Sequence, residues 1–158
     1  MKYKRFEELP VWQAAIDVAE RVFALTSCPA FRRQRTLRDQ LERATLSISN
    51  NIAEGFERGT TQELLTFVYI ARGSAGETRS VFHLLERIAA FADLRSEISD
   101  LKSKAESISR QLRGWADSLQ NTQIRGPRYL TTKVRKFEER KREREEFLKE
   151  LRARLSQE

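Results

Sequence analysis

The chain has few of the residues that form disulfides, metal sites and catalytic groups. Its 158 residues include one cysteine, Cys28, and one histidine, His83. A lone cysteine cannot form a disulfide within the chain, which is typical of proteins from a reducing cytoplasm. There is no His/Cys cluster for zinc, and any Cys-His pair or Ser-His-Asp triad would depend on His83. We therefore expect no enzyme activity, no metal and no cofactor.

Long apolar runs and phosphate-binding glycine loops are also missing. No segment approaches the roughly 18 consecutive apolar residues of a membrane span, and no apolar stretch follows the basic residues 1–5 to form a secretion signal. The glycines follow no predicted strand, so a Walker-type loop has no support. A di-iron bundle site is excluded because Ser80 stands where the Glu-x-x-His motif ending at His83 needs a glutamate. We expect a soluble, cytoplasmic protein without a membrane partner.

Charge, in contrast, is abundant and unevenly distributed. Lys and Arg number 30 against 23 Asp and Glu, which gives a net charge of +7 and a pI near 9.9. Residues 1–120 hold 18 basic and 16 acidic residues, a net of +2, whereas residues 121–158 hold 12 and 7, a net of +5. A basic extension on a nearly balanced domain predicts a polyanionic partner, RNA or DNA.

Only three prolines and six glycines interrupt the chain, and apolar residues recur at steps of three and four. This spacing predicts four amphipathic helices, over about residues 10–26, 33–55, 60–91 and 94–119. With short connections they form an all-α, up-down four-helix bundle. The residues expected to face its core are Val11, Ala15, Val18, Val22, Leu25, Leu37, Leu41, Ala44, Ile48, Ile52, Leu64, Phe67, Ile70, Ala71, Ser74, Val81, Leu84, Leu85, Ile88, Leu94, Ile98, Leu101, Ala105, Ile108, Leu112, Trp115 and Leu119.

Glycines and asparagines within these helices need separate explanations. Gly55 is expected to adopt the left-handed conformation that closes the second helix. Gly73 and Gly76 each cost about 1 kcal/mol in helix propensity, which indicates close approach of another backbone. That backbone belongs either to the same bundle, the alternative we favour, or to a second subunit. Asn50 and Asn51 either bond locally near the helix end or face a partner.

The C-terminal segment differs from the helices before it. Residues 121–131 contain Gly-Pro and predict a linker. Residues 132–158 favour a helix with i,i+4 ion pairs, but Lys141 and Arg144 interrupt its apolar seam. The predicted organisation is therefore a bundle over 1–120, a linker over 121–131 and a basic, charged helical extension over 132–158. This extension is either a solvated helix or an arm that becomes ordered on RNA or a protein partner.

Several motifs occur together in the order and spacing of a known family. They are Leu9-Pro10-Val11-Trp12-Gln13-Ala14-Ala15, Leu41-Glu42-Arg43-Ala44, Asn50-Asn51-Ile52-Ala53-Glu54-Gly55 and Ala71-Arg72-Gly73-Ser74. Over roughly residues 6–118 they resemble the four-helix bundle family of proteins encoded in intervening sequences of bacterial 23S ribosomal RNA genes. The same family includes the accessory variability determinant of diversity-generating retroelements. The resemblance implies a basic, barrel-like homopentamer without enzyme activity, which in the retroelement branch binds the reverse transcriptase and template RNA and supports mutagenic cDNA synthesis.

Three hypotheses for the function follow. The first, favoured by the basic tail, is a non-catalytic nucleic-acid-binding accessory protein of a retroelement; the second is a 23S intervening-sequence protein. The third is a structural oligomerisation module that acts through protein contacts only. Arginine has forked donors that suit phosphate. The predicted nucleic-acid-binding residues are Arg32, Arg33, Arg35, Arg38, Arg72, Arg79, Arg125, Arg128, Lys133, Arg135 and Lys136.

Overall fold

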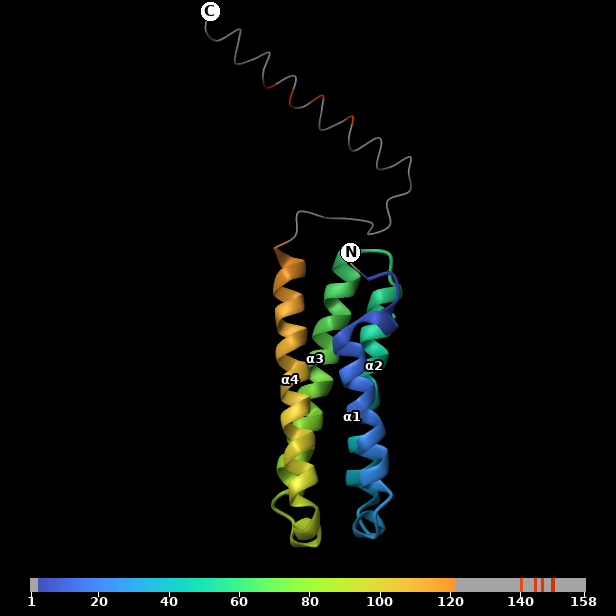
Figure 1. The fold of residues 1–158 in the computed structure, drawn as a ribbon, viewed down its shortest axis with the longest axis vertical. Helices are drawn as coiled ribbons and strands as arrows, with labels where there is room; N and C mark the ends of the chain where they lie inside the picture. Colours follow the sequence, from blue (N-terminus) through green and yellow to red (C-terminus); the bar gives the residue numbers. More distant parts are fainter. Residues whose placement is uncertain (1–2, 122–139, 141–143, 145, 147–148, 150–158) are drawn as a thin grey trace, which may run out of the picture. The chain divides into compact units, whose positions relative to one another are not determined.

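Four helices form an up-down bundle in the computed structural model, which describes residues 3–121 and the single positions 140, 144, 146 and 149. The helices are α1 (Pro10–Thr26), α2 (Arg35–Glu57), α3 (Thr61–Leu85) and α4 (Arg95–Gln120) (Figure 1). The 3₁₀ helix η1 (Phe6–Glu8) precedes α1, while η2 (Pro29–Phe31) and η3 (Ala89–Leu94) connect α1 to α2 and α3 to α4. The predicted all-α four-helix bundle is confirmed.

The chain divides into two compact units, Met1–Gly126 and Pro127–Glu158. The predicted boundaries of the bundle, the linker and the helical extension, at residues 120 and 131, stay predictions. Most of the extension lies outside the described residues. No helix within the described part of the chain is long and apolar enough to cross a membrane.

The bundle closes because each helix packs on two others. Contacts join α1 to α2, α2 to α3, α3 to α4 and α4 back to α1. This order makes α1 and α3 one diagonal pair and α2 and α4 the other. The apolar faces meet along the central axis, where all five predicted core positions of α1 are buried. In α4 the predicted seam is buried from Ile98 to Leu112, and Ala116 takes the central place next to the half-buried Trp115.

The third helix is shorter than its apolar spacing predicts. It ends at Leu85 instead of about residue 91. Beyond it, η3 turns Phe91 into the core, where the ring is fully buried against Phe31. Apolar residues at helical spacing fit both a continued helix and a turn that buries one large ring, so only packing separates the two.

The buried face of α3 also differs from the prediction. Ile70 and Leu84, expected to face the core, are each 46% exposed. The face that is buried instead centres on Val68, Ala75 and Phe82. At about 3.6 residues per turn, Ile70 and Leu84 lie more than a quarter of a turn away from that centre.

Gly55 does not close α2, so the left-handed assignment is wrong. The helix continues through Gly55 to Glu57. A Cβ atom added at Gly55 would lie only 2.5 Å from the Cβ of Phe67 on α3. Glycine is therefore required by the close approach of α2 and α3.

Gly73 and Gly76 show the opposite situation. Both are exposed, and a Cβ atom added at either position would meet nothing within 4 Å. The favoured explanation, close packing within the same bundle, is wrong for both residues. A second subunit is the alternative that stays open.

Local hydrogen bonds account for one residue of the asparagine pair, Asn51. The amide of Asn51 donates to the carbonyl oxygen of Ser47 at 2.7 Å and to the Ser47 hydroxyl at 2.9 Å. This satisfies the amide within its own helix. Asn50 is exposed to solvent.

Candidate nucleic-acid interface

One end of the bundle is built from the two connections that contain η2 and η3 (Figure 1). Their hydrophobic anchor is the pair Phe31 and Phe91, which are 1% and 0% exposed and whose ring centroids lie 4.6 Å apart. Cys28, immediately before Pro29, has an extended backbone, as the residue before a proline prefers. Because the two rings pack on each other, the two connections are held side by side.

The first connection carries three of the predicted arginines. Arg32, Arg33 and Arg35 are exposed, and their side chains make no ion pair or hydrogen bond with another residue of the described chain. Arg38 lies further along α2 and is partly neutralised. Its guanidinium binds the Asp39 carboxylate at 2.9 Å and lies 3.9 Å from the Glu42 carboxylate.

The second connection adds two arginines that were not among the predicted binding residues. Arg87 and Arg95 flank η3, are exposed, and likewise have no ion-pair partner among the described residues. They are more than fifty residues from Arg35 in the chain, so only the antiparallel packing of the helices brings the two groups to one end. The one feature of the sequence that could have identified them is their position on either side of the turn between α3 and α4. We call the surface the arginine end; its members are Arg32, Arg33, Arg35, Arg87 and Arg95.

Most acidic groups near the arginine end are already paired. Both oxygens of Glu86 accept hydrogen bonds from the Lys102 ammonium at 2.6 Å. The carboxylates of Glu97 and Asp100 each bind Arg21 at 2.6 Å. Asp93, exposed in η3, has no ion pair with a described residue. Among the described residues, five guanidinium groups without an ion pair therefore gather at this end, against Asp93 and, further along α1, Glu20 as carboxylates without one.

The helix starts add to this positive potential. Both α2 and α4 begin at the arginine end, and their N-cap residues, Gln34 and Leu94, make no side-chain capping bond. The first backbone N–H groups of a helix lack partners inside the helix and carry the positive end of its dipole. Arginine at such a position is unfavourable for the helix by about 0.3–1 kcal/mol. Helix stability thus does not explain why Arg35 and Arg95 stand there.

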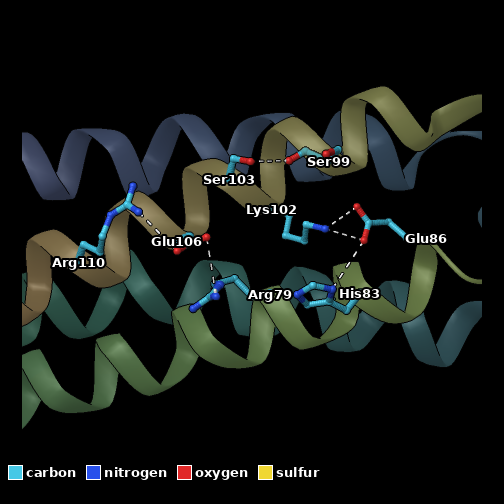
Figure 2. A network of polar contacts seen from close by, with 8 residues as sticks. All are labelled: Arg79, His83, Glu86, Ser99, Lys102, Ser103, Glu106 and Arg110. Carbon is cyan, nitrogen blue, oxygen red and sulfur yellow. Dashed lines mark hydrogen bonds and ion pairs between the residues drawn. The ribbon is translucent and has the colours of Figure 1, made fainter.

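Arg72 and Arg79, the two other predicted arginines in the bundle, lie away from the arginine end on α3. Figure 2 shows Arg79 in a polar network between α3 and α4, with a guanidinium nitrogen 3.9 Å from the carboxylate of Glu106. Its Nε is buried without a hydrogen-bond partner. Glu106 also lies 3.4 Å from Arg110. Arg79 thus contributes to the contact between two helices, and a role of Arg72 or Arg79 in binding stays a prediction.

The remaining predicted binding residues belong to the C-terminal segment. They are Arg125, Arg128, Lys133, Arg135 and Lys136, and all of them lie outside the described residues. Their role in binding stays a prediction.

A groove lies between α1 and α4, away from the arginine end's five arginines. Its volume is about 490 Å³, and Val18 and Ile108 are among the residues that line it. Arg21, also at this groove, donates hydrogen bonds to two carboxylates, and these bonds, the one to Asp100 first and those to Glu97 second, raise its pKa above the ordinary value. The described residues contain no group of three or more His, Cys, Asp or Glu that could hold a metal ion.

The fold and the arginine end together define a small four-helix bundle of nearly balanced charge with exposed positive charge at one end. Residues 7–114 match the family described as 23S rRNA-intervening sequence protein, and the chain belongs to this family. The predicted resemblance to that family is confirmed. The comparisons do not extend to the retroelement branch, and the comparison with curated proteins finds no match.

A solved structure supports the fold. The chain is similar to a protein of unknown function from the S23 ribosomal protein family of Bacteroides thetaiotaomicron VPI-5482, with a TM-score of 0.58 and 20% sequence identity. The match covers 67% of this chain and 97% of that one. At this identity the likeness concerns the fold alone.

Proposed function

We propose that this chain is a non-catalytic, homo-oligomeric RNA-binding protein whose arginine end contacts RNA phosphates. The observation that carries the proposal is the arginine end itself, where two connections distant in sequence place together five exposed arginines that have no ion-pair partner in the described part of the chain. Charges of one sign gathered at one surface repel each other. A polyanion relieves this repulsion, and the arginine fork can bind phosphate oxygens in pairs.

The family supports RNA as the polyanion, because its description refers to 23S rRNA. The basic C-terminal segment, with a net charge of +5 over residues 121–158, is a second source of positive charge. DNA has the same backbone charge and is the second candidate. We propose the cytoplasm as the place where binding occurs.

Charge reversal tests the role of the arginine end. The variant Arg32→Glu/Arg33→Glu/Arg35→Glu should weaken RNA binding at least about tenfold at moderate salt, since three phosphate contacts become repulsive. Fluorescence anisotropy with a labelled RNA measures the affinity. Circular dichroism checks that the variant keeps its helices.

The matched control reverses three arginines elsewhere, Arg5, Arg110 and Arg113, whose side chains are 69–70% exposed. It changes the net charge equally, so a purely global charge effect would weaken both proteins alike. Equal weakening, or unchanged binding by the first variant, would remove the arginine end as the binding site. Association that is insensitive to salt, in a protein that binds no RNA, would support the oligomerisation module instead.

We also propose self-association, with the pentamer implied by the family resemblance as the stoichiometry. Gly73 and Gly76 leave an open surface on α3, and Tyr69, Ile70 and Leu84 of the same helix are 40–46% exposed. Three of the five exposed large hydrophobic residues in the described chain thus lie on one helix. Exposed apolar patches next to small side chains suit the close approach of another protein surface.

The finer role that we propose is support of a retroelement reverse transcriptase through its template RNA. The basic tail favours it, because such a tail can reach RNA beyond the bundle. The genomic location of the gene distinguishes the two RNA hypotheses. An adjacent reverse transcriptase gene with template and variable repeats supports the retroelement role, whereas a location inside a 23S rRNA gene supports the intervening-sequence role.

A further inference from the structure

We propose that the arginine end binds the phosphate backbone of double-helical RNA and does not read its bases. This inference rests on the proposed RNA-binding function and adds the class of RNA. Three features of the described chain carry it: the burial of the aromatic rings, the separation of the two arginine groups, and the scarcity of amide and free acidic side chains beside them.

Aromatic rings are the first feature. Proteins that hold single strands stack the bases on exposed rings, which contribute about 1–3 kcal/mol per base. At the arginine end, Phe31 and Phe91 are 1% and 0% exposed and pack on each other. Phe23 is 43% exposed, but it lies on the flank of α1, before the connection begins. The two connections therefore offer no stacking platform.

The positions of the arginines are the second feature. Arg32, Arg33 and Arg35 lead into α2, whereas Arg87 and Arg95 flank the turn into α4, which is diagonal to α2. Neighbouring helix axes lie about 8–10 Å apart, so diagonal ones lie roughly 11–14 Å apart. Two cationic groups at this separation can each follow one phosphate strand across a groove of a duplex. The buried pair Phe31 and Phe91 between them holds the spacing constant.

The polar side chains of the two connections are the third feature. In a groove wide enough to admit them, arginine reads guanine, asparagine and glutamine read adenine, and acidic residues read cytosine. Between α1 and α2 the only amide is Gln34, which is half-buried. The connection from α3 to α4 holds two acidic side chains, Asp93 and Glu86, and both oxygens of Glu86 accept hydrogen bonds from Lys102. The major groove of A-form RNA is too narrow for side chains to read. On an RNA duplex the arginine end therefore binds the phosphate backbone and recognises the shape of the helix, and it does not read the base sequence.

The number of arginines sets the expected salt dependence. On a duplex, each neutralised phosphate contributes about −0.9 to the slope of log K against log salt. Five contacts give a slope of about −4.5 from the arginine end, and removing two of them lowers its magnitude by about 2.

Anisotropy titrations of the full chain, purified free of nucleic acid, test the proposal. The probes are an RNA duplex of roughly 20 base pairs, each of its strands alone, a duplex of different sequence, and the matching DNA duplex. We expect the RNA duplex to bind at least about tenfold more tightly than either strand and than the DNA duplex, with less than about threefold change between duplex sequences. The variant Arg87→Glu/Arg95→Glu should weaken duplex binding and lower the slope, whereas Arg110→Glu/Arg113→Glu should not. The C-terminal segment is the same in both variants, so their difference reports the arginine end.

Other outcomes separate this proposal from the function on which it rests. Single strands bound as tightly as the duplex, or binding lost in Phe23→Leu, overturn the duplex assignment and leave RNA binding intact. A DNA duplex bound as tightly as the RNA duplex overturns the assignment to RNA helices. No binding of any RNA rejects both the duplex proposal and the proposed function.

Discussion

Gly55 determines how closely two helices of the bundle approach each other. The residue lies inside α2, and an added Cβ atom would lie 2.5 Å from the Cβ of Phe67 on α3. A Cβ atom is fixed to its backbone, so the contact cannot be relieved by rotating a side chain. The guanidinium of Arg58 lies over the Phe67 ring, 5.2 Å from the ring centroid. Glycine costs the helix about 1 kcal/mol relative to alanine, and the close packing of α2 on α3 that glycine allows offsets this cost.

We expect Gly55→Ala to destabilise the protein by about 1–3 kcal/mol, because α2 and α3 must move apart to admit the methyl group. Urea unfolding followed by circular dichroism measures the change. Gly114→Ala is the matched control: Gly114 lies inside α4 with nothing within 4 Å of an added Cβ. That control should be stabilised by up to about 1 kcal/mol. A stabilised Gly55→Ala protein would show that the two helices separate at no cost.

At the scale of the element, α3 shows how one capping residue fixes a helix start. Thr60 and Glu63 have the spacing of a capping box, and half of the box is formed: the Glu63 backbone N–H donates to the Thr60 hydroxyl oxygen at 3.2 Å. The Glu63 carboxylate accepts from the Thr60 hydroxyl at 2.7 Å, where the reciprocal box would use the Thr60 backbone N–H. One residue therefore serves as both acceptor and donor at the start of the helix.

Thr60→Ala should destabilise the protein by about 1 kcal/mol, because the Glu63 N–H loses its acceptor. Thermal unfolding detects this as a lower Tm. Thr66→Ala serves as the control, since the exposed Thr66 hydroxyl only bonds back to the Gln62 carbonyl within α3. Its substitution should leave the Tm unchanged or slightly higher because alanine favours the helix. Equal losses in both proteins would mean that the cap does not stabilise α3.

At the scale of the whole molecule, two surfaces of the bundle remain without partners within the described chain. The arginine end gathers positive charge, and the exposed side of α3 combines Gly73 and Gly76 with apolar residues. They suit different partners, a polyanion in the first case and a second protein surface in the second. Binding of RNA and self-association can therefore occur together.

We expect the purified protein to be larger than its 18.5 kDa monomer when measured by size-exclusion chromatography with light scattering. Gly73→Leu should shift the mass toward the monomer, because a large side chain blocks close approach of another subunit. The bundle itself has room for the side chain, since nothing lies within 4 Å of an added Cβ. Gly114→Leu, at an equally open position on α4, should keep the wild-type mass. A monomeric wild-type protein would reject self-association.

The sequence alone determined that four helices form, and it determined the inward face of α1. Steps of three and four place Val11, Ala15, Val18, Val22 and Leu25 on one side of α1, and all five are buried. Neighbours at these spacings share a helix face whatever the rest of the chain does. The same local rule correctly predicted the all-α bundle.

Tertiary structure decided what depends on distant residues. Only packing ends α3 at Leu85, because the burial of Phe91 against Phe31 forms between two connections some sixty residues apart. Only packing makes Gly55 a contact residue and brings Arg87 and Arg95 to the same end as Arg35. Local spacing records which residues share a helix face, whereas the charge and shape of a surface depend on which helix ends meet.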